Sequence, residues 1–196
     1  MLSFIILTLI PTGGSPKSAE DADLLLNKNE SINTLIKEYF QAKKTVNMDA
    51  LGTLVSDVNQ IDREKFMAMA QYVEDYQNIN CYVIESDEDA AYRVYVKYDM
   101  KLKDINTLAP CLSAFYVTST SDDKYVIYLS ALDEVQENFI LSADKNKKIV
   151  RLKQEVAAGL QSAIDKDETF KQLYQKMDSG IHTDVEPAAA SGAAAQ

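Results

Sequence analysis

The sequence predicts an α+β domain, in which N-terminal helices pack on an antiparallel sheet of about four strands and further helices follow. Apolar residues recur with helical spacing up to residue 76 and again after residue 133. The segment between them is rich in β-branched and aromatic residues that alternate with polar ones. Short turns between successive strands favour an antiparallel meander, and strands grouped between runs of helices are typical of the α+β class.

Three helices are expected ahead of the sheet. The first has apolar residues at i, i+3, i+4, i+7 and i+8, and Lys43 and Lys44 complement its C-terminal end. The second begins after the cap Asn47 and the third after the cap Asp62. Their apolar stripes are, in order, Ile32, Leu35, Ile36, Tyr39 and Phe40; Ala50, Leu51, Leu54 and Val55; and Phe66, Met69, Ala70, Val73 and Tyr76.

Four strands are expected next, over residues 79–85, 92–101, 111–119 and 124–130. The second has the clearest alternation in the chain. Its two sets of residues are Tyr92, Val94, Val96, Tyr98 and Met100, and Arg93, Tyr95, Lys97, Asp99 and Lys101. We expect the first set to face the helices and the second to face water.

Helical periodicity returns after the sheet. A short helix is expected over residues 133–141. A longer one has an apolar stripe of Ile149, Leu152, Val156, Leu160 and Ile164. Asp165 with Glu168 resembles a capping box for a last helix, which carries Phe170, Leu173, Tyr174 and Met177.

The two ends of the chain differ from the middle. Residues 2–10 form an apolar run that is too short to cross a bilayer. Three interpretations stay open: the rear half of a membrane anchor that begins upstream, an atypical signal segment, and a short interfacial helix or core strand. The expected organisation is an anchor or signal segment with a polar linker over 1–28, the folded domain over 29–178 and an Ala-rich flexible tail over 179–196.

The composition argues against several functional classes. With 20 Lys and Arg against 30 Asp and Glu, the net charge is −10, which argues against nucleic-acid binding. One histidine and two cysteines exclude an HExxH zinc site and a four-thiolate zinc site. His182 lies beyond the last predicted helix, where we expect it to be a bystander. No catalytic residue, cofactor or metal site is predicted.

Three other sets of residues invite a chemical interpretation. The acids Asp57, Asp62, Asp87, Glu88 and Asp89 lack the ligand spacing and the glycine of a calcium loop, so we expect them to be turn acids. Cys81 and Cys111 lie on different predicted strands, where a disulfide and two separate thiols both stay open. A solvated helix face is the simplest interpretation of the basic cluster Lys145, Lys147, Lys148, Arg151 and Lys153.

The polar side of the second strand is the candidate functional surface. We expect Arg93, Tyr95, Lys97 and Asp99 to point away from the helices, where an outward tyrosine between charges suits contact with a protein partner or a second copy. The alternative is a solvated face that touches nothing. The 11 tyrosines also leave open a tyrosine-lined pocket beside the simpler interpretation of cross-strand aromatic packing.

Three helices followed by an antiparallel sheet resemble the nuclear transport factor two-like superfamily of cone-shaped, cystatin-like α+β domains. The resemblance covers about 29–177 and is most specific in residues 78–82, 92–98 and 107–117. These segments look like uncharacterised extracytoplasmic domains of clostridial-type Gram-positive bacteria. That family supplies no catalytic residues, and Cys111 stands where its typical members have glycine.

The resemblance implies a strongly curved, cone-like sheet. It also implies a non-catalytic binding or scaffold domain, held on the extracellular side of the cell membrane by its N-terminal segment, with secretion as the alternative location. Two other functions stay open: an isomerase- or lyase-type enzyme with a Tyr/Asp pocket in the cone, and a component of a secretion or conjugation complex. Asp99 lies in the polar phase of its strand, which offers little burial to raise the pKa of a catalytic base.

Overall fold

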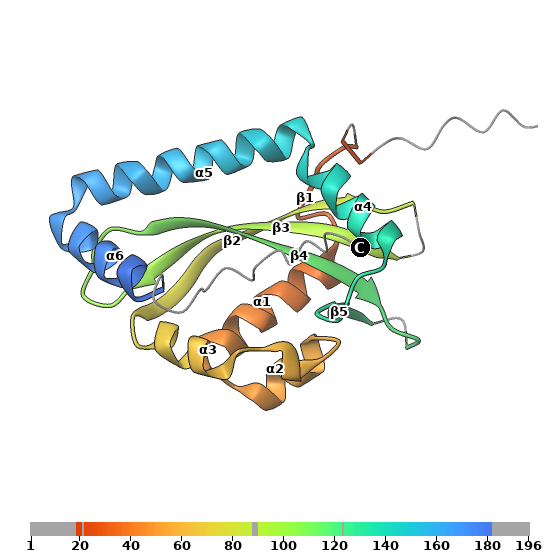
Figure 1. The fold of residues 1–196 in the computed structure, drawn as a ribbon, viewed down its shortest axis with the longest axis horizontal. Helices are drawn as coiled ribbons and strands as arrows, with labels where there is room; N and C mark the ends of the chain where they lie inside the picture. The colour runs from red at the N-terminus through yellow and green to blue at the C-terminus, as the bar shows by residue number, and fades with distance from the viewer. Residues whose placement is uncertain (1–18, 21, 88–89, 123, 182–196) are drawn as a thin grey trace, which may run out of the picture.

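The computed structural model describes residues 19–20, 22–87, 90–122 and 124–181, and they form an α+β fold around one curved antiparallel sheet (Figure 1). The five strands follow one another in space as they do in the chain, in the order β1-β2-β3-β4-β5. They are β1 (Leu25–Leu26), β2 (Val73–Glu85), β3 (Ala91–Leu102), β4 (Ala109–Ser119) and β5 (Tyr125–Ile127). The predicted fold class and the antiparallel meander are confirmed.

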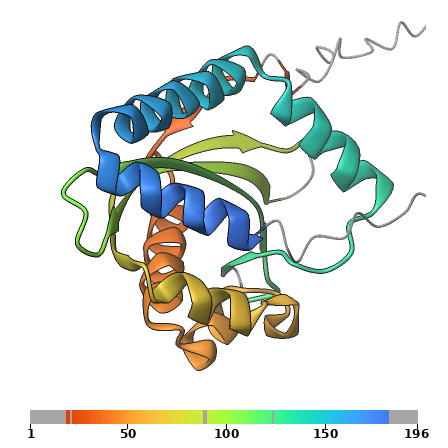
Figure 2. The ribbon, with the colours of Figure 1, turned by 60° about the vertical axis from the view of Figure 1, so that its left-hand side comes forward.

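Helices cover both faces of the sheet. One face carries α1 (Glu30–Thr45), α2 (Met48–Leu54), the 3-10 helix η1 (Val58–Gln60) and α3 (Arg63–Ala70). The other face carries α4 (Glu134–Asp144) and α5 (Lys147–Lys166). Figure 2 shows α6 (Glu168–Ile181) folding back from the end of α5. The sheet is therefore the middle of three layers.

Side-chain caps fix the starts of the helices. The Asn47 side chain accepts a hydrogen bond from the N–H of Ala50 at the start of α2. Asp62 accepts one from the N–H of Lys65 at the start of α3. Both predicted caps are confirmed.

The predicted cap at Asp165 is wrong. Helix α5 continues to Lys166, and Asp167 accepts the N–H of Phe170 at 3.0 Å. Asp165 still belongs to α5, where its carboxylate accepts a hydrogen bond from the Gln161 side chain on the exposed side of the helix. Two acids close together in the sequence offered the same capping chemistry, and the end of α5 decides which of them is used.

The third helix is shorter than its apolar stripe predicts. It ends at Ala70, and Val73 and Tyr76 belong to β2, where they pair with Leu102 and Met100. The long partner strand β3 offers these residues ladder hydrogen bonds that outweigh their helical spacing. Asn78 adopts a positive φ of 51° where the β2–β3 register shifts, a conformation that asparagine tolerates well.

Two predicted boundaries also change. Strand β5 covers only Tyr125–Ile127, and the N–H of Tyr128 adds one more hydrogen bond in the same register, to the carbonyl of Tyr116. The domain boundary predicted at residue 29 is too late, because Leu25 pairs with Val83 in the sheet. Part of the predicted linker therefore belongs to the domain.

The segment before β1 is also attached to the far side of the domain. The side-chain amide of Asn146, which lies between α4 and α5, donates to the carbonyls of Ala19 and Ala22 at 3.1 Å each. Asn146 is only 2% exposed, so these two carbonyls are the acceptors that its buried amide requires.

The main core lies between α1 and the sheet. Val94, Val96 and Tyr98 of β3 point into it and pack with residues of α1 that include Ile36 and Phe40. Val94 and Val96 have no exposed surface, so the predicted inward phase of this strand is confirmed. Burial of such apolar side chains is the main favourable contribution to folding.

Replacing Val96 by Asp should lower the free energy of unfolding by about 3 kcal/mol or more, because an unpaired charge would enter this core. Lys97→Ala is the matched control on the next residue. It removes an ion pair with Glu155 from a partly exposed site and should cost no more than about 1 kcal/mol. Denaturant melts of both variants measure the difference, and equal losses would contradict the strand phase.

Candidate functional site

The polar side of β3 is covered by helices. Tyr95 has no exposed surface and packs with Ile149, Leu152 and Val156 of α5. The prediction that this side faces water is wrong, because the apolar stripe of α5 is buried by packing against this side of the sheet. The sequence held a signal for it, since Tyr95 is an aromatic residue in an otherwise charged phase.

A polar cluster ties the sheet to the turn between α4 and α5. The Tyr95 hydroxyl donates to Asp144 at 2.5 Å, and Arg93 Nη2 donates to the two Asp144 oxygens at 3.3 and 3.4 Å. Lys153 Nζ lies 3.6 Å from the same carboxylate. Burial works against the charge on Asp144, but the Tyr95 hydroxyl and the two cations outweigh it, and the pKa of Asp144 lies below its usual value.

The other two residues of the predicted contact face lie farther along β3. Lys97 Nζ is 2.5 Å from Glu155 of α5, and Asp99 accepts a hydrogen bond of 2.7 Å from the Asn78 side chain. Both are only partly exposed. Together with Arg93 and Tyr95 they therefore serve contacts inside the protein, and the four residues do not form a free surface.

Aromatic rings fill the inside of the cone. The rings of Phe40 and Tyr98 lie 4.6 Å apart, those of Phe40 and Tyr76 5.0 Å, and those of Tyr39 and Phe115 5.3 Å. Burial raises the pKa of Tyr39 to about 12, and burial is also the main reason that the pKa of Tyr76 rises to about 12. These tyrosines pack as a core and stay protonated at neutral pH.

No carboxylate is buried within the described ranges. Apart from tyrosines and cysteines, Asn146 is the one buried polar residue there. Lys43 closes the aromatic core toward α3, with its ammonium 5.3 Å from the centre of the Phe66 ring and 5.7 Å from that of Tyr76. Burial lowers the pKa of Lys43. Among the described residues, the interior thus offers a cation and hydroxyls, but no carboxylate that could act as a general base.

The two cysteines are separate thiols. Burial is the main cause that raises the pKa of Cys81 and of Cys111 to about 11, so neither is a thiolate at neutral pH. Of the two alternatives that the sequence left open, the structure has the unpaired one, and it leaves both thiols poor nucleophiles.

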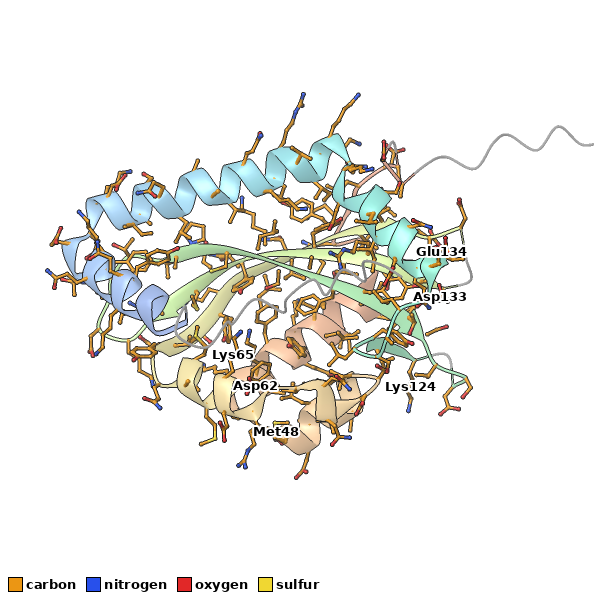
Figure 3. The ribbon with its side chains drawn as sticks, viewed as in Figure 1. Met48, Asp62, Lys65, Lys124, Asp133 and Glu134 are labelled. Carbon is orange, nitrogen blue, oxygen red and sulfur yellow. The ribbon has the colours of Figure 1, made fainter. Side chains whose placement is uncertain are left out.

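The acidic turns have structural roles. Asp57 accepts the N–H of Asn59 at the start of η1, and Figure 3 shows Asp62 beside Lys65 at the start of α3. Glu88, Asp89 and His182 lie outside the described residues. In the part of the chain that the structure describes, no three acid, cysteine or histidine side chains are grouped so that they could hold a metal ion.

The basic cluster at the end of α4 and the start of α5 is partly paired. Lys145, Lys148 and Lys153 form ion pairs with Glu20, Asp23 and Asp144, respectively. The first two hold the segment before β1 against the start of α5. The predicted solvated helix face therefore also anchors the beginning of the domain.

The outer side of β4 is the feature that the sequence analysis missed. Strand β5 pairs with it only from Val117 to Ser119. Within the described ranges, no backbone group pairs with that side between Ala109 and Phe115. We call this segment the open edge.

The direction of its backbone groups follows from its neighbours. The carbonyl of Tyr116 points outward, because it accepts the N–H of Tyr128, whereas the N–H of Ser119 points to the β3 side and donates to Ala90. The β3–β4 register has no shift, so the direction alternates strictly along the strand. Residues 112 and 114 therefore present both N–H and C=O outward, and the proline at 110 presents only C=O.

A groove of about 480 Å³ accompanies the open edge. Its walls come from β4 and from Val156, Ala157 and Leu160 of α5, with Lys153 as its charged lining residue. The strand itself has no charged residue over residues 109–119.

The two sides of the open edge differ in character. Leu112 lies on the α5 side of the strand, where it packs against the cluster around Tyr95. Ser113 lies on the other side, with its hydroxyl 3.3 Å from that of Tyr98. An apolar side chain and a hydroxyl thus stand next to each other in the sequence and face opposite layers.

Comparison with known proteins adds no relative. No family model, no curated protein and no solved structure matches the chain. The described residues also contain no helix with the length and apolar character that a membrane span requires. The apolar run 2–10, on which the anchor hypothesis depends, lies outside the described residues.

Asp144→Asn should lower the free energy of unfolding at pH 7 by about 2 kcal/mol, because it weakens charge-assisted hydrogen bonds to Tyr95 and Arg93. A folded-state pKa below the unfolded value means that this stabilisation is present above about pH 4 and is lost as the pH falls through the folded-state pKa. The gap between wild type and variant should therefore close in acid. Asp165→Asn, at an exposed site, is the control, and a gap that persists at pH 2 would contradict the role of the charge.

Proposed function

We propose that the chain is a non-catalytic binding domain that takes up an extended segment of protein along the open edge of β4. The observation that carries this proposal is the outward N–H and C=O of Leu112 and Ala114 beside an apolar groove. An added strand gains affinity from such main-chain hydrogen bonds and specificity from its alternate side chains. Folded proteins usually protect such an edge with charged residues, proline or a covering segment, and the open edge has one proline and no charged residue.

The two sides of the added strand would meet different surroundings. Side chains on the α5 side enter the groove formed by Leu112, Val156 and Leu160, which favours apolar residues at alternate positions. Side chains on the other side lie beside Ser113 and the hydroxyl of Tyr98. The preferred segment is therefore an extended one with apolar residues in period two.

The filled interior supports a binding role over the enzyme alternative. Tyr39 and Tyr76 are core residues with raised pKa values, and both thiols are protonated at neutral pH. An isomerase- or lyase-type reaction needs a base near its working pH inside the cone. Asp99, the candidate acid in the sequence, instead bonds Asn78 at the polar side of β3.

Peptide selection tests the binding role. A library of linear nonamers displayed on phage should yield peptides that bind the full chain. Ala114→Pro removes an outward N–H but no hydrogen bond to β3. It should lower the affinity for the selected peptides about tenfold or more, because one hydrogen bond is lost and the adjacent one is disturbed. Ala114→Thr keeps the N–H and should change affinity by less than about threefold.

Thermal melts of both Ala114 variants control for folding, since proline is tolerated at edge strands. A selected peptide that binds the proline variant as tightly as wild type would place its site elsewhere. Failure of the library to yield any peptide whose binding depends on Ala114 would contradict the proposal.

We further propose that the domain works on the extracellular side of the cell membrane, held by its N-terminal segment, with release as the alternative. The apolar run 2–10 followed by a polar linker supports this location. A reporter that is active only outside the membrane, fused after Gln196 in bacterial cells, should be active. Activity from a cytoplasmic reporter alone would contradict it.

A further inference from the structure

We infer that the segment bound at the open edge is β4 of a second copy, so that two chains form a twofold dimer with one continuous antiparallel sheet. This inference rests on the proposed function, since it names the occupant of the same site. It differs from the contact face predicted at Arg93 and Tyr95, because α5 covers Tyr95 and Arg93 pairs with Asp144 of α4. In Figure 1 helix α5 extends along β4 on the opposite side of the sheet from α1.

The room along β4 determines the register. On its outer side, β5 and the residue after it occupy the strand from Tyr116 onward, because Tyr128 donates to Tyr116 and Ile127 pairs with Val117. Only residues 109–115 of β4 are therefore available to pair with a partner strand. A twofold antiparallel pairing that uses the whole of this stretch has its axis at Leu112, the middle residue.

This register matches the available donors and acceptors. The two Leu112 residues exchange N–H and C=O with each other, since both groups point outward. The N–H of each Ala114 donates to the carbonyl of Pro110 in the other copy. Proline has no N–H to return, and its place at the end of the open edge limits the pairing there.

Charge also favours this edge for self-association. The chain has a net charge of −10, so two copies repel each other over most of their surfaces. The open edge has no charged residue, and the charged residue that lines its groove is the cation Lys153. Neighbouring β3, in contrast, carries three charges over the length that pairs with β4, at Arg93, Lys97 and Asp99. A second copy therefore meets little like-charge repulsion along β4.

The same register brings the Leu112 side chains together on the α5 side of the sheet. Each lies next to the groove formed with Val156 and Leu160, where it covers apolar surface of both copies. The small, exposed Ala114 leaves room beside each leucine. On the other side of the sheet, Cys111 of one copy lies opposite Ser113 of its partner in a close, non-hydrogen-bonded pair.

Ser113→Cys tests this register directly. Directly opposite residues of such a pair lie about 4.5 Å apart at Cα, within the range of a disulfide. In the full chain at pH 8.5, copper phenanthroline should join the introduced thiol at position 113 of one copy to the native Cys111 of the other. Each disulfide forms with loss of two protons and transfer of two electrons to the copper complex. The expected result is a reducible dimer on a non-reducing gel.

Two variants control for chance collisions. Ala114→Cys lies opposite Pro110 and should stay monomeric on the gel. Cys111→Ala combined with Ser113→Cys should lose the cross-link, whereas a cross-link in this double variant would overturn the register by placing the axis at Ser113. Thermal melts check that each variant folds.

Sedimentation of the wild-type chain keeps the test independent of the cysteine variants. A dimer that Ala114→Pro weakens about tenfold or more supports the inference. A wild-type chain that stays monomeric at 100 μM, or a dimer that gives no cross-link between position 113 and Cys111, would overturn it. In that case, the proposed function would still hold if displayed peptides bind in a way that depends on Ala114. If no such peptides are found, both the dimer and the proposed function are contradicted.

Discussion

Tyr95 has no exposed surface, so its hydroxyl needs a partner inside the protein, and Asp144 supplies it at 2.5 Å. The same carboxylate accepts two contacts from Arg93, whose side chain is only 14% exposed. Without Asp144, the Tyr95 hydroxyl and the Arg93 guanidinium would stay desolvated but lose their hydrogen-bond acceptor. The turn between α4 and α5 is therefore held at one place above β3, and the position of α5 over the sheet follows from it.

The position of α5 in turn shapes the outer side of β4. Its apolar stripe covers Tyr95 and Leu112, and the next residues along the helix form one wall of the groove beside the open edge. Because α5 lies over the face of the sheet while β5 is short, the backbone of Leu112 and Ala114 keeps its outward hydrogen-bonding groups. A strand added there extends a sheet that is already covered on both faces. Binding at this edge therefore requires no rearrangement of the core.

Aromatic side chains pack together in the interior of the cone. Phe40, Tyr76 and Tyr98 pack against one another, and Lys43 closes the cluster with its ammonium over the rings. Aromatic rings at these distances are a stable core by themselves. Activity in a cone requires an open cavity with a group of shifted pKa directed into it, and here the groups with raised pKa values are the packing residues themselves.

The sequence by itself determined the local structure, because helical stripes, caps and strand alternation depend on neighbours within a few residues. The caps Asn47 and Asp62 and the inward phase of Val96 follow from such spacing. Only the tertiary structure decided which surfaces are covered. Whether Tyr95 faces water depends on where the distant helix α5 packs, and whether Leu112 lies on a free edge depends on the length of β5. Both depend on contacts between segments far apart in the chain, which no local periodicity records, and for that reason Tyr95 was predicted to face water although α5 covers it.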